Sequence, residues 1–335
     1  MSEFRIDQIT NQSGSRGPDI AGITTFSGTS GMVMPSGPTE YRGGRGRGLF
    51  AGGQIPGPGD TDTIDYVTIS TLGNATDFGN LSGTKRASAA AASSTRGLVF
   101  GGLSGPSLQN TIEYITISAT GNSFDFGDLT EATWTVAGLS NNVRAVCVGG
   151  GTPLPDVNMD YVTIASLGNA SDFGDTTFPT QGPAACASPT RGIHAGGTSP
   201  AFNLNAIGYI TISTTGNAQD FGDLTVAREG PAGLSNSIRG VFGSGDTPAK
   251  LNVIDYITIA SLGDAQNFGD LSYTDSYIGA TASQTRGLFA GGYSPFTNNV
   301  EFITISTTGD TTDYGDLTVA RGVVAGCSDS HGGLG

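Results

Sequence analysis

Charged side chains are scarce in this chain, and basic ones are the scarcer kind. Only 13% of the 335 residues are charged, and 15 basic residues stand against 29 acidic ones, for a net charge of −14. Nucleic-acid binding needs a clustered Lys/Arg surface that neutralises phosphates, so this balance argues against a nucleic-acid partner. We interpret the excess of acid as an acidic, soluble surface.

Long apolar runs are also missing. No stretch of 18 or more apolar residues occurs, so the sequence predicts no membrane insertion. The first ten residues, MSEFRIDQIT, lack a basic segment followed by an apolar one, and they therefore predict no signal peptide of the usual kind.

Cysteine and histidine are too sparse for the common disulfide and metal arrangements. The three cysteines, Cys147, Cys186 and Cys327, belong to different repeats of the chain and predict buried free thiols. The two histidines, His194 and His331, are isolated in the sequence, and no nucleophile, base and acid can be assigned to one constellation. We therefore expect no metal, no cofactor and no enzymatic activity.

Glycine is plentiful, at 54 residues, and it punctuates a repeat of about 47 residues. A tyrosine marks each copy, with phenylalanine in the last: Tyr66, Tyr114, Tyr161, Tyr209, Tyr256 and Phe302. An arginine recurs in phase with it: Arg47, Arg96, Arg144, Arg191, Arg239 and Arg286. Two independent markers thus define the same six copies, and a period of this size indicates a propeller or a solenoid.

Each copy contains four segments with strand character. A small apolar segment, such as Gly322–Ser328, precedes an arginine strand that ends in a glycine pair, as in Arg286–Gly292. The tyrosine strand, such as Ile112–Ser118, has apolar residues on both faces, and a Gly-Asn or Gly-Asp turn leads from it into a strand with the motif DFGD or a variant. This order predicts a four-stranded antiparallel blade, and radial repetition of such blades protects the sheet edges.

The ends of the repeat array predict how the ring closes. The first copy begins at its arginine strand, near Gly46, without a small strand before it, whereas a spare small strand, Val323–Cys327, follows the last copy. We therefore predict an all-β fold, a six-bladed propeller over residues 46–335, in which the C-terminal strand completes the first blade.

Residues 1–45 lie outside the repeat and are rich in Gly, Ser and Pro, which predicts an extended N-terminal arm. The arm carries more apolar residues than a linker needs: Ile20, Ile23, Phe26, Met32, Val33 and Met34. We interpret it as a docking arm that becomes ordered on a partner, and a disordered leader is the alternative.

The DFGD motif resembles the metal-binding motif of kinases, but the sequence has no kinase glycine-rich loop or catalytic-loop motif. Its paired acids leave calcium binding open, although the loop has fewer ligands than a calcium hand; the alternative is that they cap turn amides or pair with a repeat arginine. The segment Ser123–Trp134 resembles a sialidase Asp-box, which is itself a structural turn.

Two sets of connections differ in every copy: those from the glycine pair to the tyrosine strand, and those from the DFGD strand to the next small strand. In a four-stranded blade both sets emerge on one face, which we call the variable face; the opposite, uniform face carries the short turns. Loops on a rigid scaffold commonly hold binding residues. Aromatic residues on such loops can stack on sugar rings or fill partner pockets, and the alternative is that they cap the blade cores. The candidate binding residues are Trp134, Phe178, Phe202, Tyr273, Tyr277, Tyr293 and Phe296.

The succession of arginine, glycine pair, tyrosine and aromatic over residues 47–335 resembles the kelch repeat, a propeller family. The chain departs from that pattern in three respects. The spacing of 12 residues from Tyr66 to Phe78 is longer than is typical, Phe or Tyr replaces the usual Trp, and Gly243-Ser244-Gly245 replaces one glycine pair.

The near-identical ITIST, TGN and DFGDLT segments, together with the leader ITNQSGSRGPDIAGIT, resemble virion proteins of marine tailed phages, especially cyanophages. This resemblance implies a non-enzymatic structural protein of the virion, either a tail fibre or adhesin or a capsid-surface fibre. Such a protein would dock to other virion proteins through its arm, and homo-oligomers on the particle are one option. It would present a propeller face to a host-surface glycan or protein, or to a neighbouring subunit. The alternatives are a cellular kelch-like protein-interaction module and, less favoured, a propeller glycosidase or oxidase.

Overall fold

The computed structural model of the protein describes residues 26–27, 31–32, 46–57 and 59–334. The chain divides into two units, Met1–Gly44 and Arg45–Gly335. In the first unit, β1 (Phe26–Ser27) pairs antiparallel with β2 (Gly31–Met32). The other arm residues singled out above, Ile20, Ile23, Val33 and Met34, lie outside the described residues, so the docking role of the arm stays a prediction.

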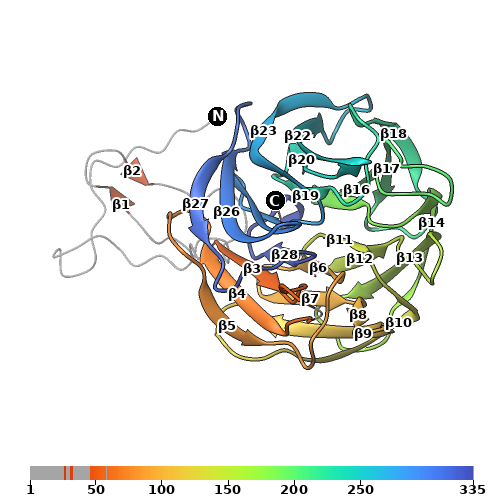
Figure 1. Ribbon diagram of the computed structural model, residues 1–335, viewed down its shortest axis with the longest axis horizontal. Coiled ribbons are helices and arrows are strands. Elements are labelled where there is room, and N and C mark those ends of the chain that lie inside the picture. Colours follow the sequence, from red (N-terminus) through yellow and green to blue (C-terminus); the bar gives the residue numbers. More distant parts are fainter. Residues whose placement is uncertain (1–25, 28–30, 33–45, 58, 335) are drawn as a thin grey trace, which may run out of the picture. The chain divides into compact units, whose positions relative to one another are not determined.

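Within the described part of the second unit, six antiparallel blades surround a central axis, as the sequence predicts (Figure 1). We letter them A to F and give their strands from the axis outward. Blade A contains β28 (Ala325–Ser328), β3 (Arg47–Ala51), β4 (Thr63–Thr68) and β5 (Thr76–Asn80). Blade B contains β6 (Ala89–Ala92), β7 (Arg96–Phe100), β9 (Ser107–Thr116) and β10 (Phe124–Thr133). Blade C contains β11 (Ala137–Ser140), β12 (Arg144–Val148), β13 (Asp156–Thr163) and β14 (Ser171–Thr180).

The second half of the ring repeats this arrangement. Blade D contains β15 (Ala184–Ala187), β16 (Arg191–Ala195), β17 (Ala206–Thr211) and β18 (Gln219–Asp223). Blade E contains β19 (Ala232–Ser235), β20 (Arg239–Gly243), β22 (Ala249–Thr258) and β23 (Gln266–Asp275). Blade F contains β24 (Gly279–Ala282), β25 (Arg286–Tyr293), β26 (Phe296–Thr304) and β27 (Thr312–Asp316). Two short strands, β8 (Leu103–Ser104) and β21 (Asp246–Thr247), extend blades B and E, and a 3₁₀ turn, η2 (Gly332–Leu334), follows β28.

The predicted closure is confirmed. Strand β28 pairs with β3 in the register Ala325↔Ala51 to Ser328↔Gly48, so the two ends of the propeller share blade A. The cysteines are buried and free, as predicted, and burial raises the pKa of the Cys186 thiol to about 12. No helix among the described residues combines the length and the apolar character needed to cross a membrane.

The repeat arginines join neighbouring blades. Each guanidinium carbon lies 4.3–4.8 Å from the centre of the ring of the repeat Tyr or Phe of its own blade. The Nη1 of each arginine also donates to a backbone carbonyl of the next blade at 2.7–3.1 Å. Arg47 of blade A bonds to Ile117 of blade B, and Arg286 of blade F bonds to Ile69 of blade A, so these bonds run around the whole ring. The two sequence markers therefore recur because blade packing requires them.

The DFGD segments also make contacts between blades. The amide of Gly121 in the turn of blade B donates to the Phe78 carbonyl of blade A at 2.8 Å. A Cβ on Gly79 would lie 2.3 Å from the Gly121 carbonyl oxygen, so this close approach requires glycine. The side chain of Asn122 accepts from the amide of Asn80 at 3.0 Å, and the same contacts recur around the ring. The motif's fixed glycine and its partner turn thus serve the fold.

A ring of backbone hydrogen bonds encircles the axis just before the innermost strands, and we call it the axial ring. Its members all have positive φ, between 50° and 66°: Ala87, Thr135, Gly182, Gly230, Tyr277 and Val323. The amide of each donates to the carbonyl of its counterpart in the preceding blade at 2.7–3.2 Å. Because Ala87 bonds to Val323, and Val323 to Tyr277, the ring closes across the two ends of the propeller.

The innermost strands alternate between two types. In blades B, D and F the second and fourth residues of the innermost strand are both alanine, as at Ala90 and Ala92; Thr281 lies between the alanines of blade F. In blades A, C and E they are glycine and serine, as at Gly138 and Ser140. The Ser140 hydroxyl donates to the Ala92 carbonyl at 2.8 Å and accepts from the Ala92 amide at 3.0 Å, and a Cβ on Gly138 would lie 2.4 Å from the Ala90 carbonyl oxygen. Ser235 makes both bonds to Ala187, and Ser328 donates to Ala282.

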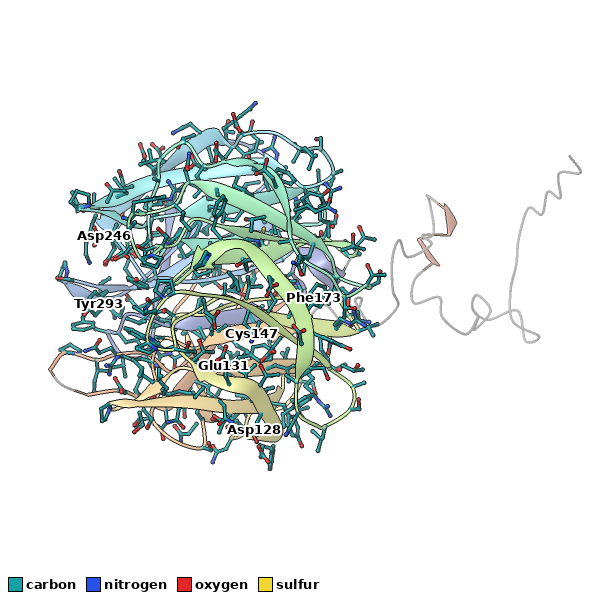
Figure 2. The ribbon with its side chains drawn as sticks, turned by 90° about the vertical axis from the view of Figure 1, so that its right-hand side faces the viewer. Asp128, Glu131, Cys147, Phe173, Asp246 and Tyr293 are labelled. Atoms are coloured by element: carbon teal, nitrogen blue, oxygen red, sulfur yellow. The ribbon has the colours of Figure 1, made fainter. Side chains whose placement is uncertain are left out.

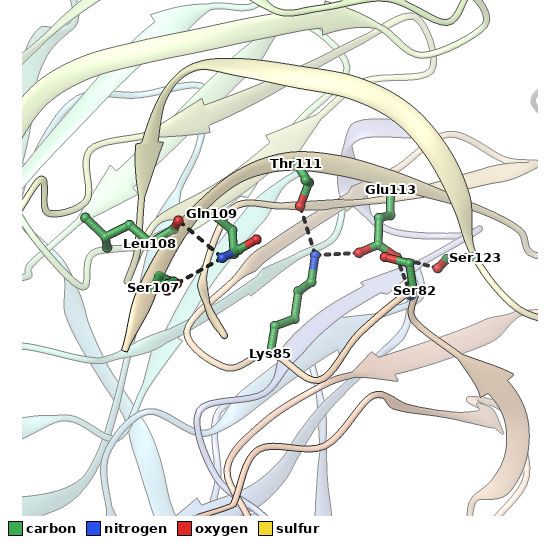
Figure 3. A network of polar contacts seen from close by, with 8 residues as sticks. All are labelled: Ser82, Lys85, Ser107, Leu108, Gln109, Thr111, Glu113 and Ser123. Carbon is green, nitrogen blue, oxygen red and sulfur yellow. Dashed lines mark hydrogen bonds and ion pairs between the residues drawn. The ribbon is translucent and has the colours of Figure 1, made fainter. Parts of the chain in front are cut away.

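In blades A, B and E a buried acid on the third strand binds a cation from the preceding link. Lys85 contacts Glu113, which also accepts from Ser123 and from the amide of Ser82 (Figure 3). Desolvation would raise the pKa of Glu113, but Lys85 and these hydrogen bonds hold it below its ordinary value. The fully buried pairs Arg321–Asp65 and Arg228–Asp255 repeat the arrangement at 3.1 and 3.0 Å.

Blade D lacks this acid, because Gly208 stands at the position and His194 of β16 occupies its space. A Cβ on Gly208 would lie 2.3 Å from His194 Nε2. The imidazole is buried, its Nε2 has no hydrogen-bond partner among the described residues, and desolvation lowers its pKa to about 4.

The truncation of the closing strand gives the first test of this architecture. Deleting Gly322–Gly335 removes β28 and one member of the axial ring, so we expect a far larger drop in melting temperature than from deleting Met1–Pro35. Thermal denaturation of both truncated chains measures this difference. Equal melting temperatures would contradict the closure.

The second test concerns His194 and pH. Because its pKa is about 4 in the folded state and 6.5 when unperturbed, the unfolded chain takes up the proton first as the pH falls. The contribution of neutral His194 to the free energy of unfolding is therefore fully present above pH 6.5, and about 3 kcal/mol of it is lost between pH 6.5 and 4. In His194→Phe, which introduces the residue that blades A, E and F carry there, urea denaturation should show a smaller loss over this window. An identical pH profile for both proteins would rule out this role.

Candidate binding site on the variable face

The two sets of variable connections meet on one face, as the sequence predicts. Isolated backbone bridges join the link after one blade to the loop of the next, as in Trp134↔Gly151, Gln181↔Thr198 and Glu229↔Asp246. In the edge-on view, Asp246 and Tyr293 lie along one edge of the propeller, away from Phe173 (Figure 2). Some connections are more regular than predicted, because β9, β10, β22 and β23 extend into them as long hairpins.

The structure separates the seven predicted aromatic residues into different roles. Phe178 and Phe202 are well exposed, at 52% and 66%; Phe178 lies near the end of β14 in blade C, and Phe202 lies on the loop between β16 and β17 of blade D. Tyr273 is mostly buried, and its hydroxyl donates to the Gly291 carbonyl at 2.9 Å, so it supports a neighbouring loop. Trp134 is half-buried, and its backbone pairs with Gly151.

The remaining three aromatic residues come together at blades E and F. Tyr277 and Tyr293 have ring centres 6.4 Å apart, and Tyr293 and Phe296 have ring centres 5.7 Å apart, with both pairs edge to face. We call Tyr277, Tyr293 and Phe296 the aromatic strip. Lys250, from β22, places its Nζ 5.5 Å from the centre of the Tyr293 ring. Tyr293 is 39% exposed, so the middle of the strip is open to solvent.

Asp275 at the end of β23 holds this arrangement in place. Its Oδ1 accepts from the amides of Ser276 and Tyr293, at 2.8 and 3.2 Å, and from Lys250 Nζ. The same lysine donates to the Ser294 carbonyl at 2.9 Å. One buried carboxylate therefore fixes both the loop that carries Tyr293 and Phe296 and the ammonium group beside it.

Two more acids lie near Tyr277 of the strip. Glu229 and Asp246 form a backbone bridge between the link and the loop of blade E. Burial, and then the charge of Asp246, raise the pKa of Glu229. Burial also raises the pKa of the Tyr277 hydroxyl, and the charges of Glu229 and Asp246 add to this effect. The strip thus combines apolar ring faces with a cation and carboxylates, the combination expected where a polar ligand with apolar faces is recognised.

Beside Tyr277, the mouth of the central channel forms a pocket of about 80 Å³, which we call the axial pocket. Two residues of each blade line it, a member of the axial ring and the residue after it. The Tyr277 ring lies across one side of the mouth, where a Cβ on Gly230 or Gly182 would be 2.9 or 3.2 Å from it. Only glycine at these two positions leaves room for the ring.

The sequence pattern includes the three residues of the aromatic strip among seven loop aromatics, without grouping them, and it does not identify Lys250, Asp275, Glu229 or Asp246. One signal was present: Lys250 is one of two lysines in the chain, and Lys85 is the other. The remaining contacts depend on how the loops of blades E and F meet, which no repeat pattern contains.

The described residues include no group of three or more His, Cys, Asp or Glu suited to a metal ion. His194 lies within blade D, and the His331 ring lies at the axis, where its Nε2 is 2.8 Å from the Ala92 carbonyl oxygen. Neither histidine is part of the strip or lines the axial pocket.

Comparison with known proteins gives no family assignment. No protein-family model matches the chain, and no curated protein sequence matches it. The likeness to kelch repeats and to cyanophage virion proteins therefore stays a prediction, and the fold and the geometry of the variable face carry the functional argument.

Proposed function

We propose that the protein is a non-enzymatic structural protein of a tailed-phage virion, a tail fibre or adhesin or a capsid-surface fibre, whose variable face binds a ligand on the host surface. A propeller with variable loops on one face is in general a scaffold for molecular interaction. The observation that carries the proposal is the aromatic strip, with Lys250 beside it and Asp275 holding both.

The apolar residues of the arm, 1–45, support a docking role for it, because they exceed what a linker needs. We infer that the arm docks the protein to other virion proteins.

The composition of the site favours a glycan. Tyr293 offers an exposed ring for stacking on a sugar, Lys250 donates hydrogen bonds, and Glu229 and Asp246 accept them. A second candidate, binding of a protein partner by the same face, is favoured by Phe178 and Phe202, which are exposed apart from the strip. These two phenylalanines supply the control for the test.

A glycan array separates the two candidates. We expect Tyr293→Ala to weaken glycan binding by about fivefold or more, because removing an aromatic anchor typically costs more than about 1 kcal/mol. Phe202→Ala, an equally large truncation outside the strip, should bind like the unaltered protein. Loss of binding in Phe202→Ala with retention in Tyr293→Ala would move the site away from the strip.

The location of the protein tests the virion part of the proposal. Mass spectrometry of purified particles should detect the chain, and antibodies against the propeller should label intact particles at the tail or on the capsid. Absence of the chain from purified particles would refute this part and favour a cellular interaction module.

A further inference from the structure

Exposed aliphatic side chains mark every second blade on the uniform face. At the turn between the third and fourth strands, blades A, C and E carry a leucine that is 59–61% exposed: Leu72, Leu167 and Leu262. At the turn between the first and second strands, blades C and E carry Val143 and Ile238, each 63% exposed. The strands beside the leucine turns lie in three alternate blades of the ring (Figure 1).

The two turns of one blade are neighbours on this face. In blade C the amide of Ile164, three residues before Leu167, donates to the Val143 carbonyl at 2.9 Å. Blade E repeats this bond, so blades C and E each present an aliphatic pair. Blade A has Gly46 at the first turn and presents Leu72 without an aliphatic neighbour there.

Blade packing does not require aliphatic residues at these turns. Blades B, D and F make the same backbone bond between the two turns, and their equivalent residues are all exposed threonines: Thr95, Thr120, Thr190, Thr215, Thr285 and Thr308. One exposed leucine is ordinary on a protein surface, but three at equivalent places in alternate blades form a threefold pattern. The pattern has no role in holding the blades together, and a partner with the same symmetry would give it one.

Carboxylates lie beside each exposed leucine. Each leucine precedes a Gly-Asn or Gly-Asp turn, whose Asn or Asp side chain accepts at 3.1–3.2 Å from the amide of a DFGD acid in the preceding blade. In the order of the leucines, these acids are Asp316, Asp128 and Asp223. The Lys and Arg residues on this face of the described propeller are the repeat arginines, which are half-buried and bonded to carbonyls. The leucines therefore lie in an acidic surface, which complements a basic partner.

These features favour one class of partner over others. Two copies of the chain packed by this face would bring carboxylates against carboxylates, which opposes association. A glycan offers mainly hydroxyl groups, whereas exposed leucines gain free energy only against an apolar surface. A trimeric protein offers the same apolar pocket three times about one axis. Three small contacts on a rigid ring then reinforce one another through their high effective concentration.

We propose that the uniform face docks onto a trimeric protein along its threefold axis, and that each subunit takes one exposed leucine into an apolar pocket flanked by Lys or Arg. This inference rests on the virion function proposed above and names the symmetry and surface chemistry of the virion protein that the propeller contacts. The variable face, on the other side of the propeller, stays open to the host-surface ligand.

The first experiment measures binding of the purified full chain to phage particles assembled without it. We expect saturation at one chain per three copies of one particle protein. The variant Leu72→Thr/Leu167→Thr/Leu262→Thr carries the residue of blades B, D and F at all three turns, so it should fold normally. It should bind the particles about a hundredfold or more weakly, which corresponds to about 2.8 kcal/mol. Leu154→Thr, which alters an exposed leucine of the variable face, should bind like the unaltered chain.

The second experiment identifies what each leucine touches on the particle. The photoreactive residue benzoylphenylalanine replaces Leu72, Leu167 or Leu262 in turn, and mass spectrometry maps the crosslinks. All three positions should crosslink to the same peptide of the same particle protein. Crosslinks to different proteins, to a second copy of the chain or to its own residues 1–45 would each overturn the inference, as would unchanged binding of the triple variant. Absence of the chain from purified particles would instead overturn the virion function itself, so the two failures give different results.

Discussion

The six backbone hydrogen bonds of the axial ring require a left-handed backbone conformation at each member, and the rest of the propeller holds these residues in it. Each member of the axial ring must adopt a left-handed conformation, yet four of the six, Ala87, Thr135, Tyr277 and Val323, are not glycine. The left-handed region costs such residues about 1–2 kcal/mol each. The closed ring, the arginine contacts from blade to blade and the strand pairing of β28 with β3 together hold them there.

The same ring gives the candidate site its rigidity. Tyr277 belongs to the axial ring through its backbone, to the aromatic strip through its ring, and to the wall of the axial pocket. Its position is therefore set by closure of the propeller and by two glycines of other blades, Gly182 and Gly230. A ligand that uses this residue meets a surface that needs little reorganisation, which reduces the entropic cost of binding.

The sequence predicts those features that every blade needs and fails where one blade differs from the others. Arginine, tyrosine and DFGD recur in phase because each makes the same contact six times, so period, blade order and closure could all be read from them. The aromatic strip could be anticipated only as exposed loop residues. Its coupling to Lys250 and Asp275 arises where the loops of two particular blades meet.

The alternation of the innermost strands limits how such a propeller can change in size. Each alanine strand has a glycine-serine strand on both sides, and Ser140, Ser235 and Ser328 each bond to an alanine strand. A ring with an odd number of blades would bring two strands of the same type together, so that either two alanine strands would face each other without the serine contact or two serines would meet. Gain or loss of a single blade is therefore disfavoured, and the natural unit of duplication for this architecture is a pair of blades.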